Sequence, residues 1–288
     1  MLSVLIPTHN DDVQPLLMEL DQQRSELDTA VEIIVWDDAS DQLTSESLQI
    51  LTSPGFKQFR SEKNQGRSTT RNLLTGKAKY DWLLFLDADT LPVNPDFLQQ
   101  YVKSIQTEPR LVHGGISYSE QVPDKEYRLR WAYGRRREMQ TLERRNVNPH
   151  LVMTGNLMIQ KQLFLDLNKD IGNFYGDDLL ISDRIRKKGI EVLHIENPVW
   201  HLGLEPSDLY LSKLLESDRV RYALESDGTL SPDLTRIQQF HHRYKWLMPF
   251  YRVCYAPWKE GARRNLIGEN PSIRTLDLYR LYHYGKNI

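Results

Sequence analysis

The chain has 288 residues and a formal net charge of −2, with 40% hydrophobic and 26% charged residues, which is ordinary for a folded globular protein. This balanced charge argues against a nucleic-acid-binding protein. The single cysteine, Cys254, excludes an internal disulfide framework, is typical of a reducing compartment, and is expected to be a buried thiol. We find neither a secretory signal nor an apolar run approaching the ~20 residues of a membrane span. The sequence therefore predicts a cytoplasmic protein, and leaves open a peripheral position at the inner membrane face.

Strands and helices alternate through residue 105. Apolar runs predict strands, and apolar residues at helical spacing predict the helices between them. The expected strands are residues 2–6, 31–36, 56–60 and 82–86, and the expected helices are residues 16–27, 44–51, 68–78 and 97–105. Such alternation is typical of an α/β fold, a Rossmann-like, mostly parallel sheet flanked by helices.

The strand at residues 82–86 ends in two carboxylates, Asp87 and Asp89. Side chains at positions i and i+2 of an extended chain point the same way, so both carboxylates can face one site. Two negative charges held this close favour a bound cation, and hard oxygen ligands suit Mg²⁺ or Mn²⁺ carrying a phosphate. The plainer alternative is an aspartate-rich turn after a core strand.

Polar clusters also follow the first two strands of the expected sheet. Thr8-His9-Asn10 follows the first strand and Asp37-Asp38 follows the second. In open α/β sheets ligands bind beyond the carboxyl ends of the strands. Three clusters at that edge therefore predict one binding site.

The pattern changes after residue 105. We expect a strand at residues 111–118, an arginine-rich helix at 125–145, a helix at 179–188 ended by Gly189, a strand at 190–195 and a helix at 209–224. The arginine-rich helix is interpreted as a solvated surface in preference to a basic wall for an anionic substrate. The aromatic and basic stretch at residues 240–252 favours packing or contact between copies of the chain over anionic lipid.

Six stretches, in this order, resemble family 2 glycosyltransferases of the GT-A fold. They are residues 4–10, 35–40, 64–72, 86–89, Thr154-Gly155-Asn156 and 176–184. The resemblance implies an inverting transfer of a hexosyl or N-acetylhexosaminyl group from a nucleotide-sugar donor to a hydroxyl of a glycan or lipid-linked acceptor, as in polysaccharide biosynthesis. It also implies a domain at residues 1–205, with a nucleotide-binding half to about residue 105 and an acceptor half beyond it, and a helical C-terminal extension at 206–288.

The resemblance assigns the donor side to the first half of the chain. Asp38 occupies the position that reads the base, and its carboxylate would accept the imide N–H of uracil. Arg71 would reach the diphosphate or brace the site, and Asp87 would contact the ribose or metal-bound water. The full set implied to bind the nucleotide sugar is Pro7, Thr8, Asn10, Asp38, Asn64, Gly66, Arg71, Asp87 and Ala88.

The resemblance also implies a metal site and a catalytic base. Asp89 is the expected direct ligand of Mn²⁺ or Mg²⁺, with His201 as a second candidate. Asp178 would remove the proton of the acceptor hydroxyl, beside Asp177. The plainer role of both aspartates is to cap the following helix.

Two other functions are weighed against the transferase. A sugar nucleotidyltransferase would need a glycine- and arginine-rich triphosphate loop, which residues 7–10 do not supply. A catalytically silent nucleotide-sugar-binding protein would have no need of a base at Asp178. Both alternatives are therefore less favoured.

Overall fold

The computed structural model describes residues 1–41 and 55–286. The chain forms two compact units that interleave along the sequence. Unit 1 comprises Met1–Ser117, Gln140–Asn173 and Asp177–Gly203, and unit 2 comprises Tyr118–Met139, Phe174–Gly176 and Leu204–Ile288. The domain boundary expected near residue 205 stays a prediction. Unit 2 contains the C-terminal helices together with two earlier segments, Tyr118–Met139 and Phe174–Gly176. The helix expected at 44–51 lies outside the described residues.

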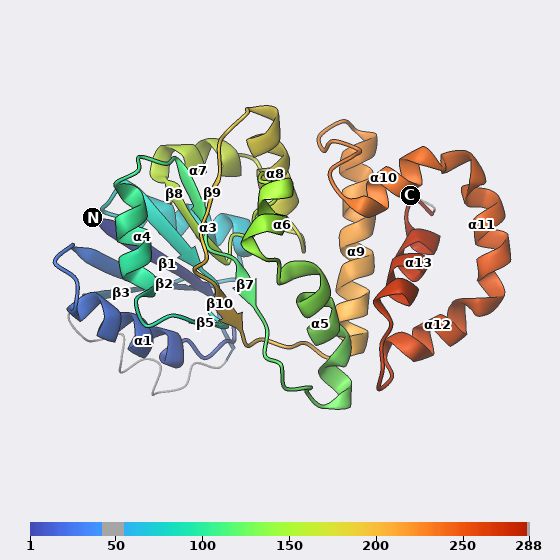
Figure 1. The fold of residues 1–288 in the computed structure, drawn as a ribbon, viewed down its shortest axis with the longest axis horizontal. Coiled ribbons are helices and arrows are strands. Elements are labelled where there is room, and N and C mark those ends of the chain that lie inside the picture. Colours follow the sequence, from blue (N-terminus) through green and yellow to red (C-terminus); the bar gives the residue numbers. More distant parts are fainter. Residues whose placement is uncertain (42–54, 287–288) are drawn as a thin grey trace. The chain divides into compact units, whose positions relative to one another are not determined.

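A seven-stranded sheet forms the centre of unit 1 within the described residues (Figure 1). Its spatial order is β3 (Phe56–Arg60), β2 (Val31–Asp37), β1 (Leu2–Thr8), β4 (Trp82–Leu86), β8 (Asn156–Gln160), β6 (Leu111–His113) and β9 (Leu193–His194). The first four strands run parallel, β8 runs antiparallel to β4 and β6, and β9 runs parallel to β6. The predicted mostly parallel α/β sheet is confirmed.

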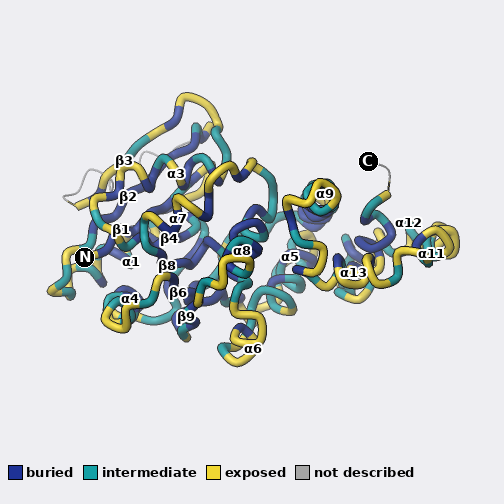
Figure 2. Tube along the Cα trace, turned by 90° about the horizontal axis from the view of Figure 1, so that it is seen from above, coloured by how far each residue is buried: buried dark blue, intermediate teal, exposed yellow. Residues whose placement is uncertain are grey.

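Helices cover both faces of this sheet, as Figures 1 and 2 show. The helices α1 (Gln14–Ser25) and α4 (Phe97–Ile105) pack together, and α3 (Arg67–Lys77) packs with α7 (Lys161–Asn168), which also contacts α8 (Asp178–Lys187). Strands β1 and β4 are almost wholly buried, because continuous apolar runs suit strands covered on both sides. This burial fixes the ends of the strands, and with them the loops of the site.

A second, three-stranded sheet brings residues from distant parts of unit 1 to the carboxyl end of β4. Strand β10 (Val199–His201) lies between β5 (Thr90–Pro92) and β7 (Ile116–Ser117). Its antiparallel register with β5 pairs His201 with Thr90, the residue after Asp89. Of its three strands only β7 lies within an expected strand, at residues 111–118.

Unit 2 is helical. It contains the helices α5 (Arg128–Tyr133), α9 (Ser207–Ser226), α10 (Arg236–Arg243), α11 (Met248–Tyr255), α12 (Lys259–Leu266) and α13 (Ile273–His283). Leucines and tyrosines from α5, α9, α12 and α13 form its core, including Leu129, Tyr210, Leu266 and Leu276. Helix α9 extends the predicted helix at 209–224 by two residues at each end.

The single helix expected at residues 125–145 is wrong. The segment consists of a 3-10 turn, η1 (Lys125–Tyr127), then α5, a π-helical turn, η2 (Gly134–Glu138), and a separate helix α6 (Leu142–Val147). Met139 takes an extended conformation that ends the first helical run, and Thr141 caps α6 by accepting the N–H of Arg144. The helical spacing persisted in the sequence across this break.

Three further expectations need correction. The strand at 111–118 is interrupted at Gly115, which has φ of +93°, and the strand at 190–195 shrinks to Leu193–His194. Cys254 is exposed rather than buried, because it lies on a face of α11 that turns to solvent. Gly189 does end α8 in the left-handed conformation expected. No helix among the described residues is long and apolar enough to cross a membrane.

Candidate active site

The loops after β1 and β2 are tied together at the carboxyl edge of the sheet. The backbone N–H of Asn10 donates to Ser40 Oγ at 2.8 Å, and Asn10 Oδ1 accepts the N–H of Asp41 at 2.8 Å. Asn10 and Ala39 both have positive φ, 62° and 60°, and the left-handed conformation is uncommon for alanine. The two loops are therefore held in a defined, partly strained shape. Thr8 is buried at the end of β1 beside them.

Asp38 anchors the loop that leads into α3. Its carboxylate accepts the N–H of Gly66 at 2.7 Å and the N–H of Gln65 at 2.8 Å. These bonds occupy much of the lone-pair capacity of a buried carboxylate. Asp38 thus orders the 64–66 loop in the structure, and its expected contact with a base stays a prediction. Asn64 is exposed on the same loop.

Asp87 is held by two arginines of α3. Arg71 Nη2 lies 2.7 Å from Asp87 Oδ1, and Arg67 Nη2 lies 3.1 Å from Asp87 Oδ2. Burial alone would raise the pKa of the Asp87 carboxyl, but the positive charges of Arg67 and Arg71 outweigh it and hold that pKa below its ordinary value. The carboxylate therefore stays ionised, and it fixes the ends of two cationic side chains at the sheet edge.

Two glycines allow backbone to approach the carboxylates of β4 closely. A Cβ atom on Gly155 would lie 2.6 Å from Asp87 Oδ2, and one on Gly203 would lie 1.9 Å from Asp89 Oδ2. Only glycine leaves room at these two positions. The Gly155 contact places the Thr154-Gly155-Asn156 motif against the strand end, and the Gly203 contact brings the chain after β10 over Asp89.

Asp89 and His201 form a pair suited to a divalent cation. His201 Nε2 lies 3.7 Å from Asp89 Oδ2, as the pairing of β10 with β5 predicts. Loss of solvent around its carboxyl, together with the negative charge of Asp89 and Asp87, raises the pKa of Asp11 to about 6, although Asp11 as a residue remains exposed. Carboxylate and imidazole ligands beside excess negative charge fit Mn²⁺ or Mg²⁺. Within residues 1–41 and 55–286 no cluster of three or more His, Cys, Asp or Glu side chains forms a complete metal cage.

The acidic pair lies at the start of α8. Thr154 Oγ1 donates to Asp178 Oδ1 at 2.6 Å, which fixes the half-buried Asp178 side chain beside the Gly155 motif. Asp177 is almost fully buried, and its Oδ1 makes no hydrogen bond within the described part of the chain. Burial first, and then the charge of Asp178, raise the pKa of Asp177 to about 6 against the opposing charges of Arg71 and Arg67. The carboxylate of Asp178 is therefore accessible and oriented. The carboxylate of Asp177 is buried, and its ionised form is disfavoured.

Replacing Asp177 by Asn is expected to stabilise the fold at alkaline pH. The raised pKa means that the folded protein resists ionisation of Asp177, so stability is lost as pH rises from the ordinary value of 3.8 through about 6. Asp177→Asn should raise the free energy of unfolding by about 1–3 kcal/mol at pH 8, measured by denaturant unfolding in EDTA. The gain should vanish at pH 4, where Asp177 is protonated. Asp96→Asn, at the exposed cap position of α4, is the control and should change little; a gain for Asp177→Asn that is independent of pH would contradict this account.

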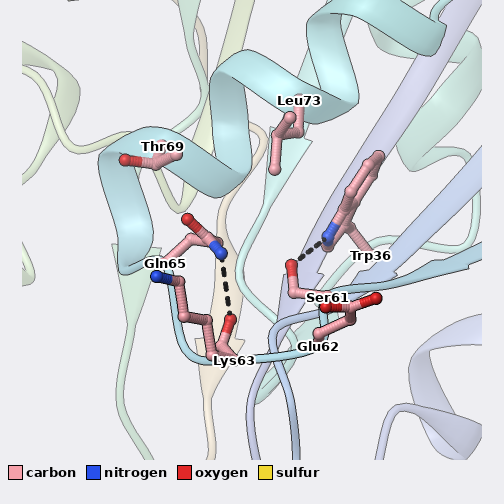
Figure 3. Close-up of a pocket in the computed structure, with 7 residues that line it drawn as sticks. All are labelled: Trp36, Ser61, Glu62, Lys63, Gln65, Thr69 and Leu73. Carbon is pink, nitrogen blue, oxygen red and sulfur yellow. Dashed lines mark hydrogen bonds between the residues drawn. The ribbon is translucent and has the colours of Figure 1, made fainter.

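An open depression of about 630 Å³ borders the loop held by Asp38 (Figure 3). Its lining is Trp36, Ser61, Glu62, Lys63, Gln65, Thr69 and Leu73. Trp36 Nε1 donates to Ser61 Oγ at 2.8 Å, and the indole stacks on Phe59 at a centroid distance of 5.2 Å. The depression lies beside α3 and the 64–66 loop, and none of the acidic residues after β4 lines it.

Continuous contacts link the expected site residues through unit 1. Asp38 binds the loop before α3, α3 binds Asp87, and Gly155 and Thr154 connect Asp87 to Asp178. Pro7 lies one residue before the end of β1, and Ala88 lies between Asp87 and Asp89, after the end of β4. The sequence motifs did not identify Asp11, Arg67 and Gly203 as site residues, and they assigned Thr154 no role of its own. The only available signal was position: Asp11 follows Asn10, Arg67 follows Gly66, and Gly203 lies two residues after His201.

Comparison with protein families and curated proteins identifies glycosyltransferases as relatives of this chain. The model of the family described as "Glycosyl transferase family 2" matches residues 3–166, more than half of the chain. An uncharacterized glycosyltransferase of Haemophilus influenzae is 34% identical over 115 residues, covering 38% of this chain and 36% of that protein. The uncharacterized glycosyltransferase YfnE of Bacillus subtilis is 26% identical over 191 residues, covering 62% and 48%. The chain thus matches about a third to a half of the length of these relatives.

Solved structures share the fold at low sequence identity. The mannosyltransferase PcManGT from Pyrobaculum calidifontis, in complex with GDP-Man and Mn²⁺, has a TM-score of 0.60 and 17% identity, covering 98% of this chain and 84% of that one. The glucosyl-3-phosphoglycerate synthase from Mycobacterium tuberculosis, in complex with Mn²⁺, UDP and glucosyl-3-phosphoglycerate, has a TM-score of 0.53 and 18% identity, covering 78% and 79%. These likenesses establish a common GT-A architecture.

Proposed function

Because the chain belongs to glycosyl transferase family 2, we propose that it transfers a sugar from a nucleotide-sugar donor to an acceptor hydroxyl with inversion at the anomeric carbon. The observation that carries this proposal is the contact network that joins the Asp38 loop, the Asp87 carboxylate and Asp178 at one edge of the sheet. Asp89 lies two residues after Asp87, and its carboxylate lies beside His201. A binding protein without catalysis would not require an oriented carboxylate at Asp178. The alternatives of a silent binder or a nucleotidyltransferase gain no support from this network.

On the donor side, the nucleotide would bind over the loops after β1, β2 and β3. Thr8, Asn10 and the Asp38-anchored 64–66 loop would contact the nucleoside, and Arg67 and Arg71 supply positive charge for the diphosphate. A uridine donor remains our proposal, since a carboxylate can accept the imide N–H of uracil. The structural relatives with UDP and with GDP-Man are compatible with a diphosphate at this edge.

Asp89 and His201 would hold Mn²⁺ or Mg²⁺ at the diphosphate. A divalent cation supplies charge neutralisation for a leaving diphosphate. The chain's own part is to hold Asp89 in place through β5 and to place His201 through β10. Arg71 and Arg67, fixed by Asp87, would add positive charge from α3.

Asp178 would act as the base on the acceptor side. Thr154 holds one carboxylate oxygen at 2.6 Å and leaves the other oxygen for the acceptor hydroxyl. Buried Asp177 follows directly on the 174–176 segment and would set the position of its neighbour. The acceptor we propose is a hydroxyl of a glycan or of a lipid-linked sugar, and the transferred group a hexosyl or N-acetylhexosaminyl unit.

Nucleotide binding tests the proposal directly. Titration calorimetry of the chain with UDP and Mn²⁺ should give one site, and EDTA or Asp89→Ala should weaken binding by at least about tenfold, because the diphosphate then loses its counter-charge. Asp166→Ala, an exposed acid on α7, is the matched control and should bind UDP normally. GDP in place of UDP tests the choice of base. Absence of binding to any nucleoside diphosphate would refute the function proposed here.

A further inference from the structure

One face of a helical segment in unit 2 packs inward. Residues 245–266 form a nearly continuous helical run through η3 (Lys245–Leu247), α11, η4 (Ala256–Trp258) and α12, which curves around α13 (Figure 1). Met248 and Leu266 are buried, Tyr251 Oη donates to the carbonyl of Leu278 at 2.8 Å, and Arg252 donates to the carbonyl of Tyr284 at 2.6 Å. These contacts fix which face of the run turns outward.

The outward face carries large apolar side chains. Trp246 is 77% exposed, Phe250 69%, Val253 74% and Trp258 72%. The spacing of four and three residues puts Trp246, Phe250 and Val253 on one side of the helix. Figure 2 shows α11 largely in yellow and teal, the colours of exposed and intermediate residues. This is the reverse of an ordinary amphipathic helix, and exposed apolar patches of this kind mark interaction surfaces.

Basic residues flank this apolar stripe in the sequence. Residues 236–264 contain seven lysines and arginines and one acid, Glu260, in a chain whose net charge is −2. Five of the seven are exposed: Arg236, Arg243, Lys245, Arg263 and Arg264. This segment is therefore strongly cationic, unlike the chain as a whole.

Charge decides between the two simplest occupants. A second copy docked symmetrically on this face would bring two basic surfaces together, with repulsion that the apolar contact would have to overcome. An anionic bilayer instead neutralises the charge, and its interface is where tryptophan is enriched. The pattern of aromatic residues on one face with arginine and lysine around them is that of an interfacial helix.

We propose that residues 240–264 dock this protein on an anionic phospholipid surface, with Trp246, Phe250 and Trp258 entering the boundary between headgroups and acyl chains. The arginines and lysines around them meet the lipid phosphates. This binding is independent of the nucleotide site and of the transfer reaction, and it needs no helix that crosses the bilayer.

Flotation of the full chain with vesicles tests this proposal. The protein should float with vesicles of phosphatidylcholine mixed with phosphatidylglycerol, should bind far less to phosphatidylcholine alone, and should be released by high salt. Trp246→Ser/Phe250→Ser/Trp258→Ser should lower the partition coefficient by at least about tenfold. Neutralising Arg263 and Arg264 with Gln should lower it by about fivefold per residue, since each basic residue near an anionic surface contributes ~1 kcal/mol.

Met18→Ser/Val147→Ser removes exposed apolar side chains from unit 1 and is the matched control, expected to float as the unchanged protein does. The arginine variants and the salt dependence keep the test decisive if the triple variant folds poorly. No flotation with anionic vesicles, or equal loss in the control, would overturn the proposal. Light scattering that finds a dimer which the triple variant dissociates, without vesicle binding, would assign the face to a second copy and overturn it too.

Discussion

Asp178→Asn should lower the rate of sugar transfer by about 10²–10⁴-fold, because the amide cannot accept the proton of the acceptor hydroxyl. The substitution preserves shape and can keep the hydrogen bond from Thr154, whose Oγ1 lies 2.6 Å from Asp178 Oδ1. Affinity for UDP with Mn²⁺ should stay within about twofold, since Asp178 lies on the acceptor side of the site. Released nucleotide, measured with and without acceptor, separates transfer from binding.

The control for Asp178→Asn is Asp208→Asn. Asp208 occupies the first turn of α9, as Asp178 occupies the first turn of α8, so both substitutions remove a carboxylate that favours a helix N-terminus. Asp208→Asn should leave transfer unchanged. Full turnover by Asp178→Asn would place the base elsewhere, with buried Asp177 the nearest alternative.

The strands near the donor site were predictable because each is a continuous apolar run that ends in polar residues. Leu83 to Leu86 and Ile33 to Trp36 can be buried on both faces only in a covered parallel sheet. The later strands are two to five residues long and pair across large sequence distances. Local patterns therefore placed β6, β7 and β9 inside longer expected strands, and predicted neither their bounds nor their pairing. The sequence does not indicate the break at Met139, because the arginine-rich segment has a helical composition on both sides of it.

The candidate site was predictable in its residues more than in its interactions. Asp87, Asp89 and Asp178 follow recognisable motifs, but a sequence does not reveal which partner occupies a carboxylate. In the structure the carboxylate of Asp38 binds the backbone of the 64–66 loop, and Arg71 lies almost entirely inside the protein. Gly203 and Thr154 acquire their roles only when distant segments meet Asp89 and Asp178.

Arg71→Met should lower the free energy of unfolding by about 2 kcal/mol. Arg71 is 1% exposed and donates to Asp87 Oδ1 at 2.7 Å, so its loss leaves a partly buried carboxylate with one fewer partner. The effect should be smaller than for a fully buried pair, because the Asp87 side chain is 23% exposed and Arg67 still binds it. Denaturant unfolding at neutral pH measures the change, and UDP affinity should fall with it.

Arg67→Met is the matched variant, because Arg67 binds the same carboxylate from the same helix with its side chain 45% exposed. It should cost less than ~1 kcal/mol, as exposed ion pairs do. Asp87→Asn combined with Arg71→Met should cost less than the two single changes added together, since each single change leaves the other partner unpaired. Arg71→Lys keeps the charge without the planar guanidinium and should recover only part of the stability. Equal costs for the two arginines would mean that burial of Arg71 does not govern the strength of this pair, and that both side chains act on Asp87 through charge alone.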